Sequence, residues 1–270
     1  MALPTQPGSA DLILGEVRRA HRRQRVSFRL QFIVTWVVLI LGLVAILASG
    51  RRGFDLEFVQ EWAPFILNGA TTTVIVSLVS IVVAVVLAGL GALGRLSTNP
   101  ILFGVASLYV SLVRGTPLIV QIFFAYLALA EVGIVLPILV AGISALAFNY
   151  GAYMTEVFRA GIQAVPRGQR EAAQALGMPE RFVMRRIVLP QAIRIVVPAI
   201  GNEFIAMIKD SALISTIGVT ELLWRAQAAG RPQVRIFEAL VFAALVYWVL
   251  TMIFSFAQGR LEKRMAKGDR

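Results

Sequence analysis

The sequence predicts an all-α integral membrane protein with about six transmembrane helices, and the first evidence is its composition. Hydrophobic residues make up 58% of the 270 residues and charged residues 15%, with a mean hydropathy of +0.77. Such a chain is more apolar than an ordinary soluble domain. The second observation is its long charge-free runs, because a helix needs about 20 apolar residues to cross a hydrocarbon core of roughly 30 Å. The runs are Leu30–Gly50, Trp62–Gly94, Leu96–Val113, Val132–Thr155 and Ala239–Gly259, of 21, 33, 18, 24 and 21 residues.

The third observation is that these runs are continuous rather than alternating. Only helices and closed barrels satisfy their backbone polar groups inside lipid. Barrel strands alternate between apolar and polar side chains, and these runs do not. The spans are therefore expected to be helices.

The N-terminal 64 residues are expected to contain a basic arm, one span and an external segment. Residues 1–29 form the arm, which carries six Arg residues and no apolar core. The apolar run that follows has about 20 residues, longer than the 7–15 of a signal-peptide core. We therefore expect 30–49 to be a retained span, followed by an external segment, 50–63, in which Trp62 suits an interfacial anchor.

Five further spans complete the predicted topology. The third is interrupted at Val113-Arg114-Gly115-Thr116-Pro117, and a basic tail, residues 259–270, ends the chain. The expected spans are 68–94, 100–129, 132–158, 186–208 and 236–258.

The net charge of +11 is explained by topology rather than by nucleic-acid binding. Under six spans, eighteen of the 26 basic residues fall on one side and seven on the other, with Arg194 inside a span. The positive-inside rule then places both termini and the loop 165–190 in the cytoplasm. The basic arm is also suited to contact anionic membrane lipid.

The polar loop 165–190 is predicted to form two short helices. Pro166 fits the first turn of a helix, and the residues from Glu171 to Leu176 favour helix. Gly177 is expected to end that helix in a left-handed conformation, and Pro179 to begin the next. From the spacing alone, the loop is either a docking element for a partner or an interfacial connector without one.

This loop, EAAQALGMPERFVMRRIVLP, resembles the EAA loop of importer-type ABC transporter permeases, which dock on separate ATPase subunits. The resemblance assigns the ATPase contact to residues of this loop. They are Glu171, Ala172, Ala173, Gly177, Ile187, Leu189 and Pro190.

Other segments resemble the polar amino acid subfamily of these permeases. They are NGATTT (68–73), SLVRGTPLIVQIFF (111–124), NYGAYMTEVFRAGIQAVPRGQREAAQALG (149–177) and KDSALISTIGVTELLWRA (209–226). The resemblance covers roughly 65–258 and implies a type I permease core with one extra N-terminal span. It also implies a bacterial inner-membrane importer with two permeases, as a homodimer or a related heterodimer, two ATPases and an extracytoplasmic binding protein.

Polar residues inside the apolar runs are candidates for the substrate pathway, because buried charge is costly unless it is paired or functional. Arg114, beside the break, suits a substrate carboxylate, and Glu156 or Glu203 suits an ammonium group. The alternative is that such residues only tie helices together, with Glu156 paired to Arg159. The candidate pathway residues are Arg114, Thr116, Asn149, Tyr153, Glu156, Asn202, Glu203, Lys209 and Asp210.

Chemistry within this chain is not expected. There is no G-x-x-x-x-G-K-[ST] loop, so ATP-Mg belongs to the expected partner ATPase. With one histidine and no cysteine, no metal site or bound cofactor is expected, and an intramembrane protease is disfavoured. A stand-alone secondary transporter or channel for small polar solutes stays open, although it gives the loop 165–190 no role.

Overall fold

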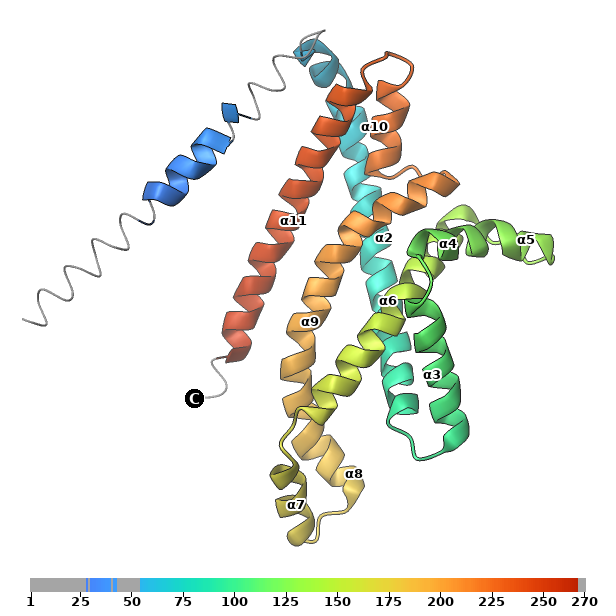
Figure 1. Cartoon of the computed structure of the whole chain (residues 1–270), viewed down its shortest axis with the longest axis vertical. Coiled ribbons are helices and arrows are strands. Elements are labelled where there is room, and N and C mark those ends of the chain that lie inside the picture. Colours follow the sequence, from blue (N-terminus) through green and yellow to red (C-terminus); the bar gives the residue numbers. More distant parts are fainter. Residues whose placement is uncertain (1–27, 29, 40, 43–53, 267–270) are drawn as a thin grey trace, which may run out of the picture. The chain divides into compact units, whose positions relative to one another are not determined.

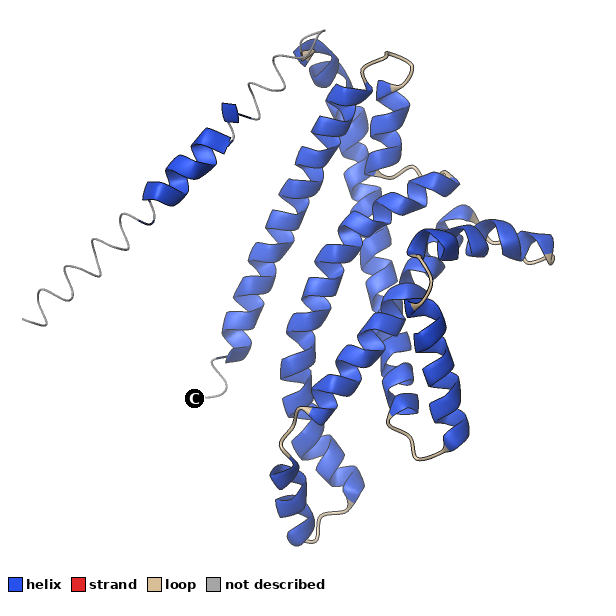
Figure 2. Cartoon of the chain, viewed as in Figure 1, coloured by secondary structure: helices blue, strands red, loops and turns tan. Residues whose placement is uncertain are grey.

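The computed structural model describes residues 28, 30–39, 41, 42 and 54–266, and all their regular structure is helical (Figure 2). The chain divides into two units, Met1–Asp55 and Leu56–Arg270. In the first unit, the described part of the predicted span 30–49 contains the apolar helix Leu30–Leu39. Most of the arm and all of residues 43–53 lie outside the described residues, so the first span and the count of six spans stay predictions.

The second unit consists of helices joined by short connections (Figure 1). In chain order they are α2 (Leu56–Arg95), α3 (Pro100–Arg114), α4 (Leu118–Phe123), η1 (Phe124–Ala128), α5 (Leu129–Glu131), α6 (Ile138–Gln163), α7 (Arg167–Ala175), α8 (Glu180–Val183), η2 (Met184–Val188), α9 (Leu189–Asp210), η3 (Ser211–Ile217), α10 (Leu222–Gly230) and α11 (Ile236–Ala266).

Four stretches of the described chain are long and apolar enough to cross a membrane. They contain α2, α6, α9 and α11, at the places where the sequence predicts spans. The predicted third span divides into two helices, Pro100–Arg114 and Leu118–Glu131, bent by 107°. The break falls at Gly115-Thr116-Pro117 because Pro117 cannot continue the hydrogen-bonding pattern of α3.

The structure corrects several predicted boundaries. Residues 56–63, expected in an external segment, form the first turns of α2, where Trp62 packs between Phe58 and Phe65. The tail is helical to Ala266 as part of α11. Residues 209–235, which the sequence analysis leaves between the last two predicted spans, are largely helical, in η3 and α10. Short helices of mixed polarity give no long periodic signal, so the sequence did not distinguish them from a loop.

Close packing between α2 and α6 organises the second unit, and α3 covers the same region (Figure 1). A Cβ atom at Gly91 would lie 2.2 Å from the Oγ1 of Thr155 on α6. A Cβ atom at Gly151 would lie 2.9 Å from the Cβ of Leu87 and 2.7 Å from the hydroxyl of Tyr109 on α3. Small residues therefore let the three helices approach closely, as is common in membrane bundles.

We predict that Gly91→Ala destabilises the bundle, whereas Gly89→Ala does not. The added methyl group at position 91 meets Thr155, and overpacking of this kind costs about 1–3 kcal/mol. At Gly89 nothing lies within 4 Å of the added atom. Thermal unfolding of both variants in detergent tests the difference, and equal melting temperatures would contradict the packing argument.

Candidate functional site

A cavity of about 270 Å³ lies among the α3–α4 corner, α6 and α9. Polar side chains line most of it. The lining residues are Thr116, Pro117, Leu118, Asn149, Tyr150, Tyr153, Glu203 and Asp210. The structure thus brings together five of the nine residues that the sequence proposed for the substrate pathway.

Gln121 holds the α3–α4 corner that forms one wall of the cavity. Its amide nitrogen donates to the carbonyl oxygens of Val113 (2.9 Å) and Thr116 (3.2 Å), and to the Thr116 hydroxyl (2.9 Å). Its amide oxygen accepts from Asn149 on α6 (3.2 Å). The Gln121 side chain therefore donates hydrogen bonds to backbone carbonyl oxygens at the end of α3, where the helical hydrogen bonds stop. It also joins the corner to α6.

The opposite wall carries two carboxylates of α9. Asp210 accepts a hydrogen bond from the Tyr150 hydroxyl at 2.8 Å, which links α9 to α6. Glu203 has no hydrogen bond or ion pair with any residue that the structure describes. Because Glu203 is half-buried and lines the cavity, its carboxylate is available to a positively charged ligand.

Arg114 is exposed beside the cavity, and its guanidinium lies 5.2 Å from the ring centroid of Tyr153. A cation over an aromatic face is held electrostatically while its donors stay free. The tyrosine ring thereby positions a cation next to the lining residues Thr116 and Tyr153.

Three predicted pathway residues lie elsewhere. Asn202 is exposed and accepts a hydrogen bond from Gln258 of α11 at 2.9 Å. Lys209 is exposed and does not line the cavity. Glu156 shares a helix with Asn149 and Tyr153 but is engaged in ion pairs outside the cavity.

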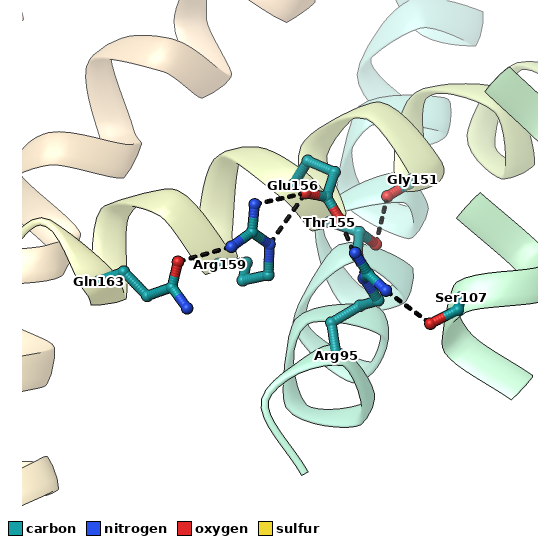
Figure 3. Close-up of polar contacts among 7 residues, drawn as sticks. All are labelled: Arg95, Ser107, Gly151, Thr155, Glu156, Arg159 and Gln163. Carbon is teal, nitrogen blue, oxygen red and sulfur yellow. Dashed lines mark hydrogen bonds and ion pairs between the residues drawn. The ribbon is translucent and has the colours of Figure 1, made fainter. Parts of the chain in front are cut away.

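Glu156 is the centre of a charged cluster that we call the Glu156 cluster: Arg95, Ser107, Glu156, Arg159 and Gln163 (Figure 3). Its carboxylate pairs with Arg95 of α2 at 3.1 Å and with Arg159, one turn along α6, at 2.7 Å. The Arg159 pair is the helix tie that the sequence analysis left as an alternative. The Arg95 partner, 61 residues away in sequence, was not foreseen.

The loop 165–190 has the predicted helix–turn–helix form. Helix α7 is followed by Gly177 at φ +76°, and Pro179 precedes α8. The two helices share a small core made of Val165, Ala173, Val183, Val188 and Ala192. Where α8 passes into α9, residues 184–188 form one π-helical turn, which accommodates Pro190 and its missing N–H.

The seven residues assigned to ATPase contact differ in exposure. Glu171, Ala172, Gly177, Leu189 and Pro190 are exposed, whereas Ala173 is buried in the loop core. Ala172 and Ile187 line a groove of about 490 Å³, together with Leu176, which is 83% exposed. Glu171 forms no hydrogen bond or ion pair with the described residues. The loop therefore presents an apolar groove and an unpaired carboxylate.

A fully buried carboxylate, missed by sequence reasoning, lies at the start of α10 against α2. Glu221 accepts hydrogen bonds from Thr73 of α2 (3.3 Å), Tyr247 of α11 and the Trp224 amide of α10 (2.8 Å). Burial raises the pKa of the Glu221 carboxyl, and these hydrogen bonds partly offset that rise. Within the described residues no cluster of three or more metal-ligating side chains occurs.

Comparison with known proteins identifies relatives that are matched almost end to end. The family described as binding-protein-dependent transport system inner membrane component matches residues 84–267. The arginine transport system permease protein ArtQ of Bacillus subtilis (strain 168) is 37% identical over 207 residues, covering 76% of this chain and 94% of ArtQ. The putative glutamine transport system permease protein GlnP of Rickettsia typhi (strain ATCC VR-144 / Wilmington) is 38% identical over 202 residues, covering 74% and 93%.

Solved structures agree with these matches. A chain from the crystal structure of an amino acid ABC transporter with histidines is 38% identical, with a TM-score of 0.75, covering 78% of this chain and 98% of that one. A chain of the inward-facing MetNI methionine ABC transporter, 18% identical with a TM-score of 0.59, shares the fold.

A bundle of apolar helices with a polar cavity and an EAA-type loop defines a membrane permease. The chain belongs to the family of binding-protein-dependent transport system inner membrane components, as an amino acid ABC transporter permease. Proteins of this family are multi-pass inner-membrane subunits and not themselves the catalytic subunits. Membership implies that an ATPase and a binding protein complete the transporter.

We predict that Gln121→Met destabilises the α3–α4 corner. Methionine fills a similar volume but leaves the Thr116 carbonyl oxygen without its donor and removes the shortest hydrogen bond to the Val113 carbonyl oxygen, at a cost of about 1–3 kcal/mol. Gln174→Met is the matched control, because the Gln174 side chain donates only to Glu180 at the surface of the loop 165–190. Thermal unfolding in detergent should separate the two variants, and a Gln121 variant as stable as the control would remove Gln121 from this role.

Proposed function

We propose that this chain is the transmembrane subunit of an ABC importer for polar or charged amino acids. The observation that carries the proposal is the cavity of about 270 Å³, in which Glu203 and Asp210 face a space bordered by Arg114. An amino acid needs a cation for its carboxylate and an anion for its ammonium group. The carboxylates come from α9, and the cation comes from the end of α3 beside the cavity.

The two carboxylates favour substrates with a second positive charge. Asp210 already accepts from Tyr150, and Glu203 has no competing protein partner. In a partly desolvated site, opposite charges attract more strongly than in water. A basic side chain would therefore be favoured over an acidic one, in keeping with an arginine permease among the relatives.

Charge removal in the cavity tests this assignment. Glu203→Gln and Asp210→Asn should each raise the KM for L-arginine uptake about tenfold, since a hydrogen bond to a charged group contributes about 1.5–3 kcal/mol. L-glutamine, with no charge on its side chain, should be affected less. Glu131→Gln is the control, because Glu131 ends α5 at an exposed position outside the cavity. Unchanged L-arginine kinetics in both cavity variants would contradict the proposed site.

Coupling to ATP hydrolysis is proposed to run through the helices α7 and α8. The groove of about 490 Å³ and the exposed side chains of Glu171 and Leu176 form a surface suited to a partner subunit. Because α6 leads into α7 and α8 leads into α9, the loop is joined to two spans that line the cavity. Closure of an ATPase dimer would move this loop and thereby change access to the cavity.

The proposed orientation places both termini and the loop in the cytoplasm. The loop and the basic end of α11 lie toward one end of the second unit, and α10 lies toward the opposite end (Figure 1). The opposite end would then meet an extracytoplasmic binding protein. A second permease, identical or related, and two ATPase subunits complete the proposed importer.

Two substitutions in the loop should uncouple transport. Gly177→Pro is incompatible with φ +76°, because proline fixes φ near −65°, so the angle between α7 and α8 is lost. Glu171→Lys places the opposite charge at the proposed interface, where a juxtaposition of like charges with a partner selected for Glu171 would cost several kcal/mol.

Both variants should insert normally but lose most ATP-dependent uptake in proteoliposomes. Gly168→Ala, on the same loop with nothing within 4 Å of the added atom, is the control. Normal uptake by both variants would exclude this loop as the coupling element.

A further inference from the structure

We propose that Arg95 and Glu156 form a joint that makes the α2–α3 hairpin move together with α6. Arg95 is then a positioning residue for transport, acting through helix movement rather than through substrate contact. The inference rests on the proposed coupling function, because it concerns how motion of the loop reaches the helices around the cavity.

Arg95 connects three helices at one point (Figure 3). Its Nε donates to Glu156 of α6 at 3.1 Å, and its Nη1 donates to Ser107 of α3 at 2.5 Å. Its guanidinium also lies 5.0 Å from the ring centroid of Phe103 on α3. Arg95 itself is the last residue of α2. One side chain therefore fixes the hairpin end to α6.

The pair is partly shielded from solvent, since the exposed fractions of the two side chains are 23% and 19%. A charge in such a place is costly without an opposite partner, so separation of α2 from α6 here is opposed by electrostatics. Arg159 also pairs with Glu156, but it belongs to the same helix and cannot hold two helices together.

Next to the Arg95–Glu156 pair, α2, α3 and α6 pack closely but form few hydrogen bonds with one another. Gly91 and Gly151 let α2, α3 and α6 touch through small surfaces, which resist compression but bear few polar interactions between helices. The Tyr109 hydroxyl donates to the Phe148 carbonyl at 2.7 Å and is a second tie between α3 and α6. At the end of the hairpin, the ion pair between Arg95 and Glu156 joins α2 to α6.

Helix α6 is the natural source of the movement. It ends at Gln163, two residues before Val165, whose side chain is buried in the core of the coupling loop with Ala173. A displacement of that loop therefore reaches α6 directly. The hairpin has no chain connection to the loop at this end, so it follows α6 through the contacts described above.

Arg95→Gln compared with Arg159→Gln tests the joint. Both substitutions remove one positive partner from Glu156, but only the first removes a bond between helices. The full chain would be reconstituted with its ATPase and binding protein in liposomes. Uptake would be measured with L-arginine, L-glutamine and L-histidine as probes, together with ATP hydrolysis.

Arg95→Gln should lower the amount of amino acid taken up per ATP hydrolysed by about fivefold or more, the lower end of typical coupling effects. Assembly of the complex should be unchanged. In Arg159→Gln, the amount of amino acid taken up per ATP hydrolysed should stay within about twofold of wild type. A twofold change corresponds to less than about 0.5 kcal/mol. Arg95→Lys, which keeps the charge, should restore part of the coupling.

A distance measurement reports on the joint independently of transport. The chain contains no cysteine, so spin labels attach to it only at Thr98→Cys on the hairpin and Ala160→Cys on α6. The distance between the labels should be the same with and without ATP in wild type and in Arg159→Gln, and should change with ATP in Arg95→Gln. An ATP-dependent distance in wild type, or an invariant one in Arg95→Gln, would overturn the joint.

The outcomes separate this inference from the proposed function. If wild type couples uptake to ATP and the two Gln variants behave alike, the joint is wrong and the proposed function stands. If the Arg95→Gln variant fails to assemble with the ATPase, Arg95 only stabilises the fold and the proposed joint is wrong. If wild type shows no ATP-dependent uptake of any probe, the proposed function is wrong and the joint is wrong with it.

Discussion

Polar side chains among long apolar helices must find partners, and this constraint accounts for how the second unit is joined together. Each of three groups connects elements that lie far apart in the sequence: Gln121 joins the α3–α4 corner to α6, Glu156 joins α6 to α2, and Glu221 joins α10 to α2 and α11. Between these ties, α2 and α6 pack through small residues. The polar contacts therefore determine which helices stay together.

Glu203 is the exception among the partly buried carboxylates discussed above, because it has no polar partner in the described part of the chain, and it lines the cavity. Glu203 is half-buried yet has no hydrogen bond or ion pair among the described residues, while nearby Asp210 is held by Tyr150. A partly buried charge without a partner is unfavourable in an empty site and is relieved by a cationic ligand. The carboxylate of Glu203, unpaired within the described chain, therefore supports the proposal that the cavity accepts an amino acid during transport.

Much of the fold was predictable from the sequence, because long apolar runs and proline or glycine breaks are local signals. The interruption at Thr116-Pro117 and the turn at Gly177 were both placed correctly. The start of α2 was missed because Glu57 and Glu61 interrupt the apolar run without ending the helix. Helix α10 was missed because it is only nine residues long.

The site was predictable in part, for a similar reason. Asn149 and Tyr153 were predicted as pathway residues because they are polar residues inside an apolar run, and both line the cavity. The same argument included Glu156, but Glu156 is engaged by Arg95, 61 positions away. No local pattern identifies such a pair. Gln121 and Tyr150 were overlooked because single polar residues in apolar helices carry no spacing signal of their own.

A detergent pull-down of the tagged chain, with mass spectrometry of the proteins that co-elute, tests whether the chain works as a subunit of an ABC importer. An ATPase subunit with a phosphate-binding G-x-x-x-x-G-K-[ST] loop should co-elute in a fixed ratio to the permease. Recovery of the chain without such a subunit, under conditions in which a known ABC importer stays intact, would contradict that role and favour a stand-alone transporter.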